Sequence, residues 1–177
     1  MSKIHLKNVR LSFPSLFKKA TFEGVETKYE ATFLISKEDV KTKKILDNEI
    51  QKMIKESKIK FLEDNICLRD GNKKMTKEGE PYDGYPGHWS LKASNEKRPT
   101  IINRDKTPLT EEDEALYAGC YVNVIVDFWI QTKRANRVNA NLHGVQFFKD
   151  GEPFGSGAID VVNEFDDLKD DLEDDDF

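Results

Sequence analysis

Apolar and polar residues alternate with a period of two in several short runs of this 177-residue chain. In the clearest run, 121–132, every even-numbered position from 122 to 130 is apolar. Residues 138–148 read as the hairpin partner of that run, and residues 4–13 and 29–35 alternate in the same way. A change of parity at Lys7–Asn8 predicts a β-bulge. Alternation of this kind is typical of half-buried strands, so the chain is predicted to be mainly β.

One segment has helical periodicity instead. Ser36 and Asp39 are spaced like a capping box, and the helix that they predict reaches about Ser57. Pro14 is predicted to end the first strand, and the polar, Gly- and Pro-rich stretch 63–87 to form a long loop. The apolar stripe of the helix comprises Val40, Leu46, Ile50, Met53 and Ile54, and further short strands are expected at 88–94, 99–103 and 158–162.

These elements fit an OB-fold-like Greek-key β-barrel with one inserted α-helix, spanning residues 1–162. A closed barrel suits a chain with many short strands because it leaves no exposed sheet edges. The helix follows the second predicted strand, whereas simple OB folds place it later in the chain. An open α+β sheet is therefore the alternative.

Charge is distributed very unevenly along the chain. Residues 164–177 carry nine acidic residues and one lysine, and removing this charge of −8 from the total of −5 leaves +3 for residues 1–163. Mutual repulsion and the small apolar content predict a disordered acidic C-terminal tail over 163–177. A basic body joined to an acidic tail is typical of a polyanion-binding site with an attached interaction segment.

Cations and aromatic residues are interleaved in two places, as single-strand binding requires. The first lies around residues 82–104, where the loop residues Tyr82 and Tyr85 are candidates for base stacking. Trp89 faces either the core or a binding groove, because it shares parity with apolar neighbours. The candidate phosphate-binding cations of this region are Lys92, Arg98 and Arg104.

The second place is the hairpin around residue 133. Lys133, Arg134 and Arg137 lie within five residues and have no acidic neighbour, so they are predicted to contact phosphates. Trp129 occupies the strand face opposite the valine row, where it either packs under the helix or is offered to a ligand.

Three segments carry a family resemblance: the N-terminal VRLSFPSLF, the stretch LYAGCYVN from residue 116, and LHGVQFFKDGE from residue 142. They resemble phage-encoded single-stranded DNA-binding proteins over residues 3–162. The tail resembles the acidic, phenylalanine-terminated tails of bacterial and phage proteins of this function. The resemblance implies an OB fold, binding without marked sequence preference, and a role in phage DNA replication or recombination in the host cytoplasm.

The tail is expected to have two roles. Tethered beside a basic groove, it would compete with DNA at low ionic strength. Once released, Phe177 would enter an apolar pocket on a replication or recombination protein, with basic residues of that partner meeting the preceding carboxylates of Asp174, Asp175 and Asp176.

Other functions have weaker support in the sequence. The three histidines are isolated and no phosphate-binding glycine loop occurs, so neither an enzyme nor a cofactor or metal is expected. The alternatives are a metal-dependent phage nuclease, suggested by Glu26-Thr27-Lys28, and a polyanion mimic acting through the tail. The charged N-terminus and the lack of long apolar runs predict a cytoplasmic protein. Preference for DNA or RNA stays open, as does the choice between monomer and homo-oligomer.

Overall fold

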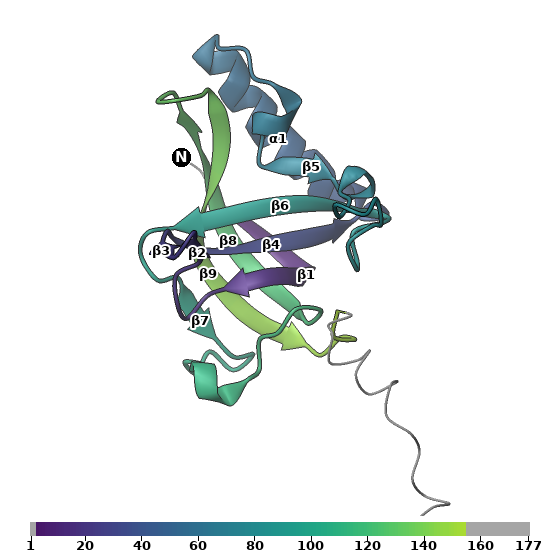
Figure 1. The fold of residues 1–177 in the computed structure, drawn as a ribbon, viewed down its shortest axis with the longest axis vertical. Helices are drawn as coiled ribbons and strands as arrows, with labels where there is room; N and C mark the ends of the chain where they lie inside the picture. The colour runs from purple at the N-terminus through teal and green to yellow at the C-terminus, as the bar shows by residue number, and fades with distance from the viewer. Residues whose placement is uncertain (1–2, 155–177) are drawn as a thin grey trace, which may run out of the picture.

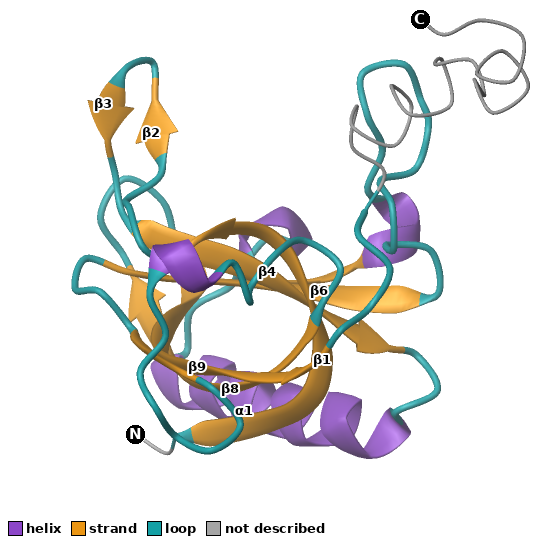
Figure 2. Cartoon of the chain, turned by 90° about the horizontal axis from the view of Figure 1, so that it is seen from below, coloured by secondary structure: helices purple, strands orange, loops and turns teal. Residues whose placement is uncertain are grey.

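The computed structural model describes residues 3–154, whose strands wrap into a closed barrel (Figure 1, Figure 2). Antiparallel pairing runs in the order β6–β4–β1–β8–β9, and a short parallel pairing of β9 with β6 closes the ring. This strand order confirms the OB-fold-like barrel, and the open α+β sheet is wrong. The barrel strands are β1 (Ile4–Ser15), β4 (Tyr29–Ser36), β6 (His88–Asn95), β8 (Tyr121–Gln131) and β9 (Arg137–Lys149).

Smaller elements decorate the barrel. β5 (Leu68–Asp70) and β7 (Thr100–Ile102) extend the sheet at its two ends, and β2 (Thr21–Phe22) with β3 (Val25–Glu26) forms a separate hairpin. The hairpin projects from the barrel in Figure 2. Three short 3-10 helices follow in the connections: η1 (Glu63–Asn65), η2 (Gly71–Lys73) and η3 (Glu111–Asp113). The strand expected at 158–162, the domain boundary near 162 and the tail lie outside the described residues.

The core occupies the inside of the barrel, as the alternation predicts. The even-numbered residues of β8 from Val122 to Phe128 are all buried. They meet Phe33 of β4, Leu91 of β6 and Leu142 of β9, none of which exposes more than 1% of its surface. Burying side chains of this size contributes about 1.5–3 kcal/mol each to the free energy of unfolding. The opposite faces of the same strands lie outside the barrel and are not part of this core.

Two distortions shape β1. Its register with β8 shifts between Leu6 and Val9, which confirms the predicted bulge, and Asn8 takes a φ of 56° there. Its register with β4 shifts again between Ser12 and Ser15, where Phe13 takes a φ of 46°. The strand continues through Pro14, so the prediction that Pro14 ends it is wrong. The second shift also turns Phe13 off the apolar face on which strict alternation placed it.

Helix α1 (Val40–Ser57) lies across one end of the barrel (Figure 1). Its N-cap is Asp39, whose carboxylate accepts a hydrogen bond from the backbone N–H of Thr42 at 3.2 Å, so the capping box led by Ser36 is wrong. Leu46 and Ile50 are buried against the barrel, but Val40 is 72% exposed and does not belong to the apolar stripe. No helix in the described part of the chain is long and apolar enough to cross a membrane.

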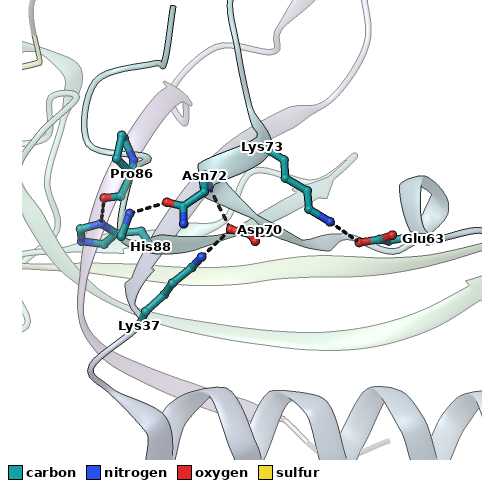
Figure 3. A network of polar contacts seen from close by, with 8 residues as sticks. Lys37, Glu63, Asp70, Asn72, Lys73, Pro86 and His88 are labelled. Atoms are coloured by element: carbon teal, nitrogen blue, oxygen red, sulfur yellow. Dashed lines mark hydrogen bonds and ion pairs between the residues drawn. The ribbon is translucent and has the colours of Figure 1, made fainter.

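A polar network connects residues 63–87, the long segment between α1 and β6 that is called the excursion below, to the barrel (Figure 3). The ammonium group of Lys37 lies 2.6 Å from the Asp70 carboxylate, which also accepts the backbone N–H of Asn72. The Asn72 side chain in turn accepts the N–H of Gly87 at 2.7 Å. Gly71 has no room for a side chain, because a Cβ there would lie 2.4 Å from the carbonyl oxygen of His88. The excursion is therefore held in place rather than free.

The network makes stability depend on pH. The hydrogen bond from Lys37 lowers the pKa of Asp70 below its usual 3.8. The ion pair therefore stabilises the folded state above about pH 4, and this contribution is lost as the pH falls through the lower folded pKa. Asp70→Asn should reduce the free energy of unfolding in urea at neutral pH, and the difference from the unmodified protein should vanish in strong acid.

Asp83→Asn is the matched control, because Asp83 is exposed in the same excursion and its replacement removes the same charge. It should leave the free energy of unfolding nearly unchanged. Equal stability of Asp70→Asn and the unmodified protein at neutral pH would contradict a stabilising role for the ion pair.

Candidate nucleic-acid interface

A groove of about 820 Å³ runs over the outer surface of the barrel. The groove lies on the outward faces of strands whose inward faces form the core. Along β6, the groove residues Ser90, Lys92 and Ser94 alternate with core residues. Glu30 and Thr32 do the same on β4. The β8–β9 hairpin supplies Gln131, Arg137 and Asn139, and the 63–87 excursion supplies the opposite wall.

The floor of the groove covers the seam where β6 meets β9. The strands pair directly at Ala93 and Ala140, and beyond that point Cys67 bridges them. Its backbone N–H donates to the carbonyl of Val138 at 3.0 Å, and its carbonyl accepts the N–H of Lys92 at 3.2 Å. Burial raises the pKa of the Cys67 thiol to about 12, so this floor residue carries no negative charge at neutral pH.

Cations outnumber acids in the groove lining by six to four. Two of the six cations pair with lining acids over long distances, Lys73 with Glu63 at 3.4 Å and Lys92 with Glu30 at 3.5 Å. Both lysines are well exposed, although the Glu30 side chain is only 26% exposed, so each pair contributes little to stability and its lysine can exchange its carboxylate for a phosphate. The six lining cations are Lys28, Arg69, Lys73, Lys74, Lys92 and Arg137.

The two tryptophans lie on different faces of their strands. Trp89 faces the core side of β6, where it packs against the core cluster, and the ammonium groups of Lys37 and Lys43 lie 4.6 and 4.1 Å from its ring centroid. It therefore does not line the groove, and of its two expected positions the structure shows the one on the core side. Trp129 pairs with Asn139 and lies two residues from Gln131, so it shares the outward face of these groove residues.

The two loop tyrosines also differ. Tyr85 lines the groove but is only 3% exposed, and its hydroxyl lies 3.1 Å from the hydroxyl of Ser12. Its ring therefore forms part of the groove wall and has little exposed surface on which a base could stack. Tyr82 is half-buried at the border of the groove, with its ring centroid 5.6 Å from that of Tyr85 and the Lys74 ammonium at 5.8 Å.

Of the predicted cations, some lie in or beside the groove and others lie away from it. Lys92 and Arg137 line the groove together, and Lys133 and Arg134 are exposed at the hairpin tip next to it. Arg98 and Arg104 do not line the groove. Their guanidinium groups lie over the rings of Phe17 and Phe148, at 5.1 and 5.6 Å.

Several groove residues were missed by sequence reasoning. Lys28 continues the outward parity of Glu30 and Thr32, so the alternation of β4 could have identified it. Arg69, Lys73 and Lys74 belong to the excursion, whose path no periodicity reveals. Within residues 3–154, no group of three or more His, Cys, Asp or Glu side chains is placed to share a metal ion. Glu26, from the nuclease alternative, lies exposed on the β2–β3 hairpin.

Known proteins resemble the chain along its length. The family model described as "Enterobacter phage Enc34, ssDNA-binding protein" matches residues 2–177. "Putative protein p50" of Acyrthosiphon pisum secondary endosymbiont phage 1 is 41% identical over 180 residues, which is 94% of each chain.

Solved structures agree. The single-stranded DNA-binding protein from bacteriophage Enc34 in complex with ssDNA has a TM-score of 0.76 and 34% identity, covering 86% of this chain and 89% of that one. Gp2.5, a single-stranded DNA-binding protein encoded by bacteriophage T7, has a TM-score of 0.57 at 12% identity, over 94% of this chain and 96% of its own, and shows a shared fold. The expected family is thus confirmed, and this chain belongs to the Enc34 family of phage single-stranded DNA-binding proteins.

Proposed function

We propose that this protein binds single-stranded DNA in the groove over β4, β6 and the β8–β9 hairpin, and acts in phage DNA replication or recombination in the host cytoplasm. The observation that carries the proposal is the groove itself, with six cations in its lining. It occupies the face of the second and third barrel strands, the surface on which OB folds bind oligonucleotides. The similar protein of phage Enc34 is described in complex with ssDNA.

The chemistry of the lining favours binding without marked sequence preference. Lysine and arginine bind phosphates, which carry no sequence information. Neutral groups such as Ser90, Ser94 and Asn139 can accompany the sugar–phosphate backbone. Trp129 is not part of the lining, but its ring centroid lies 5.9 Å from the ammonium group of the lining residue Lys28, and there it can offer a ring to any base. Only unpaired bases can reach that ring, so a single strand should bind better than a duplex.

We also propose that the acidic tail regulates this site. Its charge of −8 complements the groove, and the tether keeps its concentration there high. Phe154, the last described residue, packs beside Gly84 in the loop that carries Tyr82 and Tyr85, so the chain leaves the barrel next to the groove. DNA would displace the tail, and Phe177 with Asp174, Asp175 and Asp176 would then bind a replication or recombination protein.

An oligonucleotide titration at several salt concentrations tests the central proposal. Single-stranded DNA of mixed sequences should bind with similar affinities, and more tightly than duplex. The logarithm of the binding constant should fall with the logarithm of salt by about 0.7 per phosphate neutralised. Failure to bind bare oligonucleotide would favour the polyanion-mimic alternative, and cleavage of the DNA would favour the nuclease. A parallel RNA titration measures the preference between the two nucleic acids.

The hairpin cations give a second prediction. Replacing Lys133, Arg134 and Arg137 with alanine should weaken binding to all sequences alike and flatten the salt dependence by up to about 2, if each contacts one phosphate. Three exposed lysines that do not line the groove, Lys3, Lys7 and Lys149, provide a control of equal charge. A smaller effect of the hairpin variant than of this control would place the binding site elsewhere.

Deleting residues 164–177 tests the tail. The truncated protein should bind single-stranded DNA more tightly at low ionic strength, and the gain should shrink at physiological salt, where charges are screened beyond about 8 Å. Deleting Phe177 alone should leave DNA binding unchanged and abolish partner binding. Equal affinities of the truncated and full-length chains at low salt would contradict competition by the tail.

A further inference from the structure

Phe13 combines three features that folding alone does not explain. It is 56% exposed, although it lies in a strand whose apolar residues are otherwise buried. Its φ is 46°, a left-handed conformation that strains any residue with a side chain. The following Pro14 further restricts the backbone at this position. A large aromatic residue held outward at a cost in free energy suggests a use for its exposed ring.

The neighbours of Phe13 connect it to the groove. Its ring centroid lies 5.6 Å from that of Tyr82, with an interplanar angle of 83°, and 6.4 Å from that of Tyr85. Tyr85 lines the groove and is fixed by its hydroxyl contact with Ser12, the residue before Phe13. Lys74, another groove residue, has its ammonium 5.8 Å from the Tyr82 ring. The Phe13–Tyr82 pair therefore borders the groove at the Tyr85–Lys74 wall.

We propose that Phe13 and Tyr82 form a base-stacking platform at this border, for unpaired bases of the strand whose phosphates occupy the groove. The inference rests on the proposed function and adds a site for the bases. The edge-to-face contact fixes both rings, and the exposed part of Phe13 accepts a base of any kind. Lys74 lies close enough to bind the phosphate that accompanies a stacked base. The left-handed backbone conformation at Phe13 keeps its ring exposed before DNA binds.

Phe13→Leu tests the platform, because it keeps an apolar side chain and removes the ring. Affinity for single-stranded oligonucleotides should fall about tenfold, within the range measured for loss of one stacked base. The salt dependence should not change, since no phosphate contact is lost. In a series of oligonucleotides with a single abasic site moved along the strand, the loss should disappear at the position that stacks on Phe13.

Phe22→Leu is the control, because Phe22 is an exposed phenylalanine, at 69%, that does not line the groove. Phe13→Gly is a second variant that removes the ring and accommodates the positive φ, so it should weaken DNA binding while keeping the melting temperature. Unchanged affinity of both Phe13 variants would overturn the platform, as would a loss that no abasic position removes. Failure of the unmodified protein to bind any oligonucleotide would instead refute the proposed function.

Discussion

The parallel pairing of β6 with β9 is the interaction on which the rest of the structure depends. It joins strands at opposite ends of the antiparallel order, at Ala93–Ala140 and Ser94–Asn141, and the side chain of Asn95 adds a hydrogen bond to the carbonyl of Leu142 at 3.1 Å. Without this seam the sheet would stay open, and the apolar rows that face the barrel axis would lack their opposite wall. Because closure is short, a neighbouring segment must help, and Cys67 does so by bridging both strands.

Closure also creates the binding surface. Once the inward positions of β4, β6 and β9 are used by the core, their outward positions form one continuous strip. Serine, threonine and asparagine side chains line that strip together with lysine and arginine, and Lys92 lies between Ser90 and Ser94 on β6. The same strands thus serve stability with one face and polyanion binding with the other. The Lys37–Asp70–Asn72 network then holds the excursion that forms the far wall.

The sequence predicts those features of the fold and the site that depend on residues close together in the chain. The alternation in β4, β6, β8 and β9 identified strands, core and barrel class, because side-chain parity is a property of neighbouring residues. Lys92 and Arg137 were predicted from the local clustering of cations, which is also a property of neighbouring residues. The exposure of Phe13 was not predicted because it depends on a positive φ, and the burial of Tyr85 was not predicted because it depends on a hydroxyl contact with Ser12. The N-cap was predicted incorrectly because both Ser36 and Asp39 are suitable capping residues. The wall cations of the excursion depend on contacts distant in sequence, which periodicity does not encode.

Amide hydrogen exchange of the full-length protein, with and without a saturating single-stranded oligonucleotide, tests the central claim most directly. If DNA lies in the groove, exchange should slow in β4, in β6, in the excursion around Lys73–Lys74 and at the tip of the β8–β9 hairpin. The segment from β7 to η3, which contains Arg104 and does not line the groove, should be unaffected. Protection confined to that segment, with none along β4 and β6, would contradict the account.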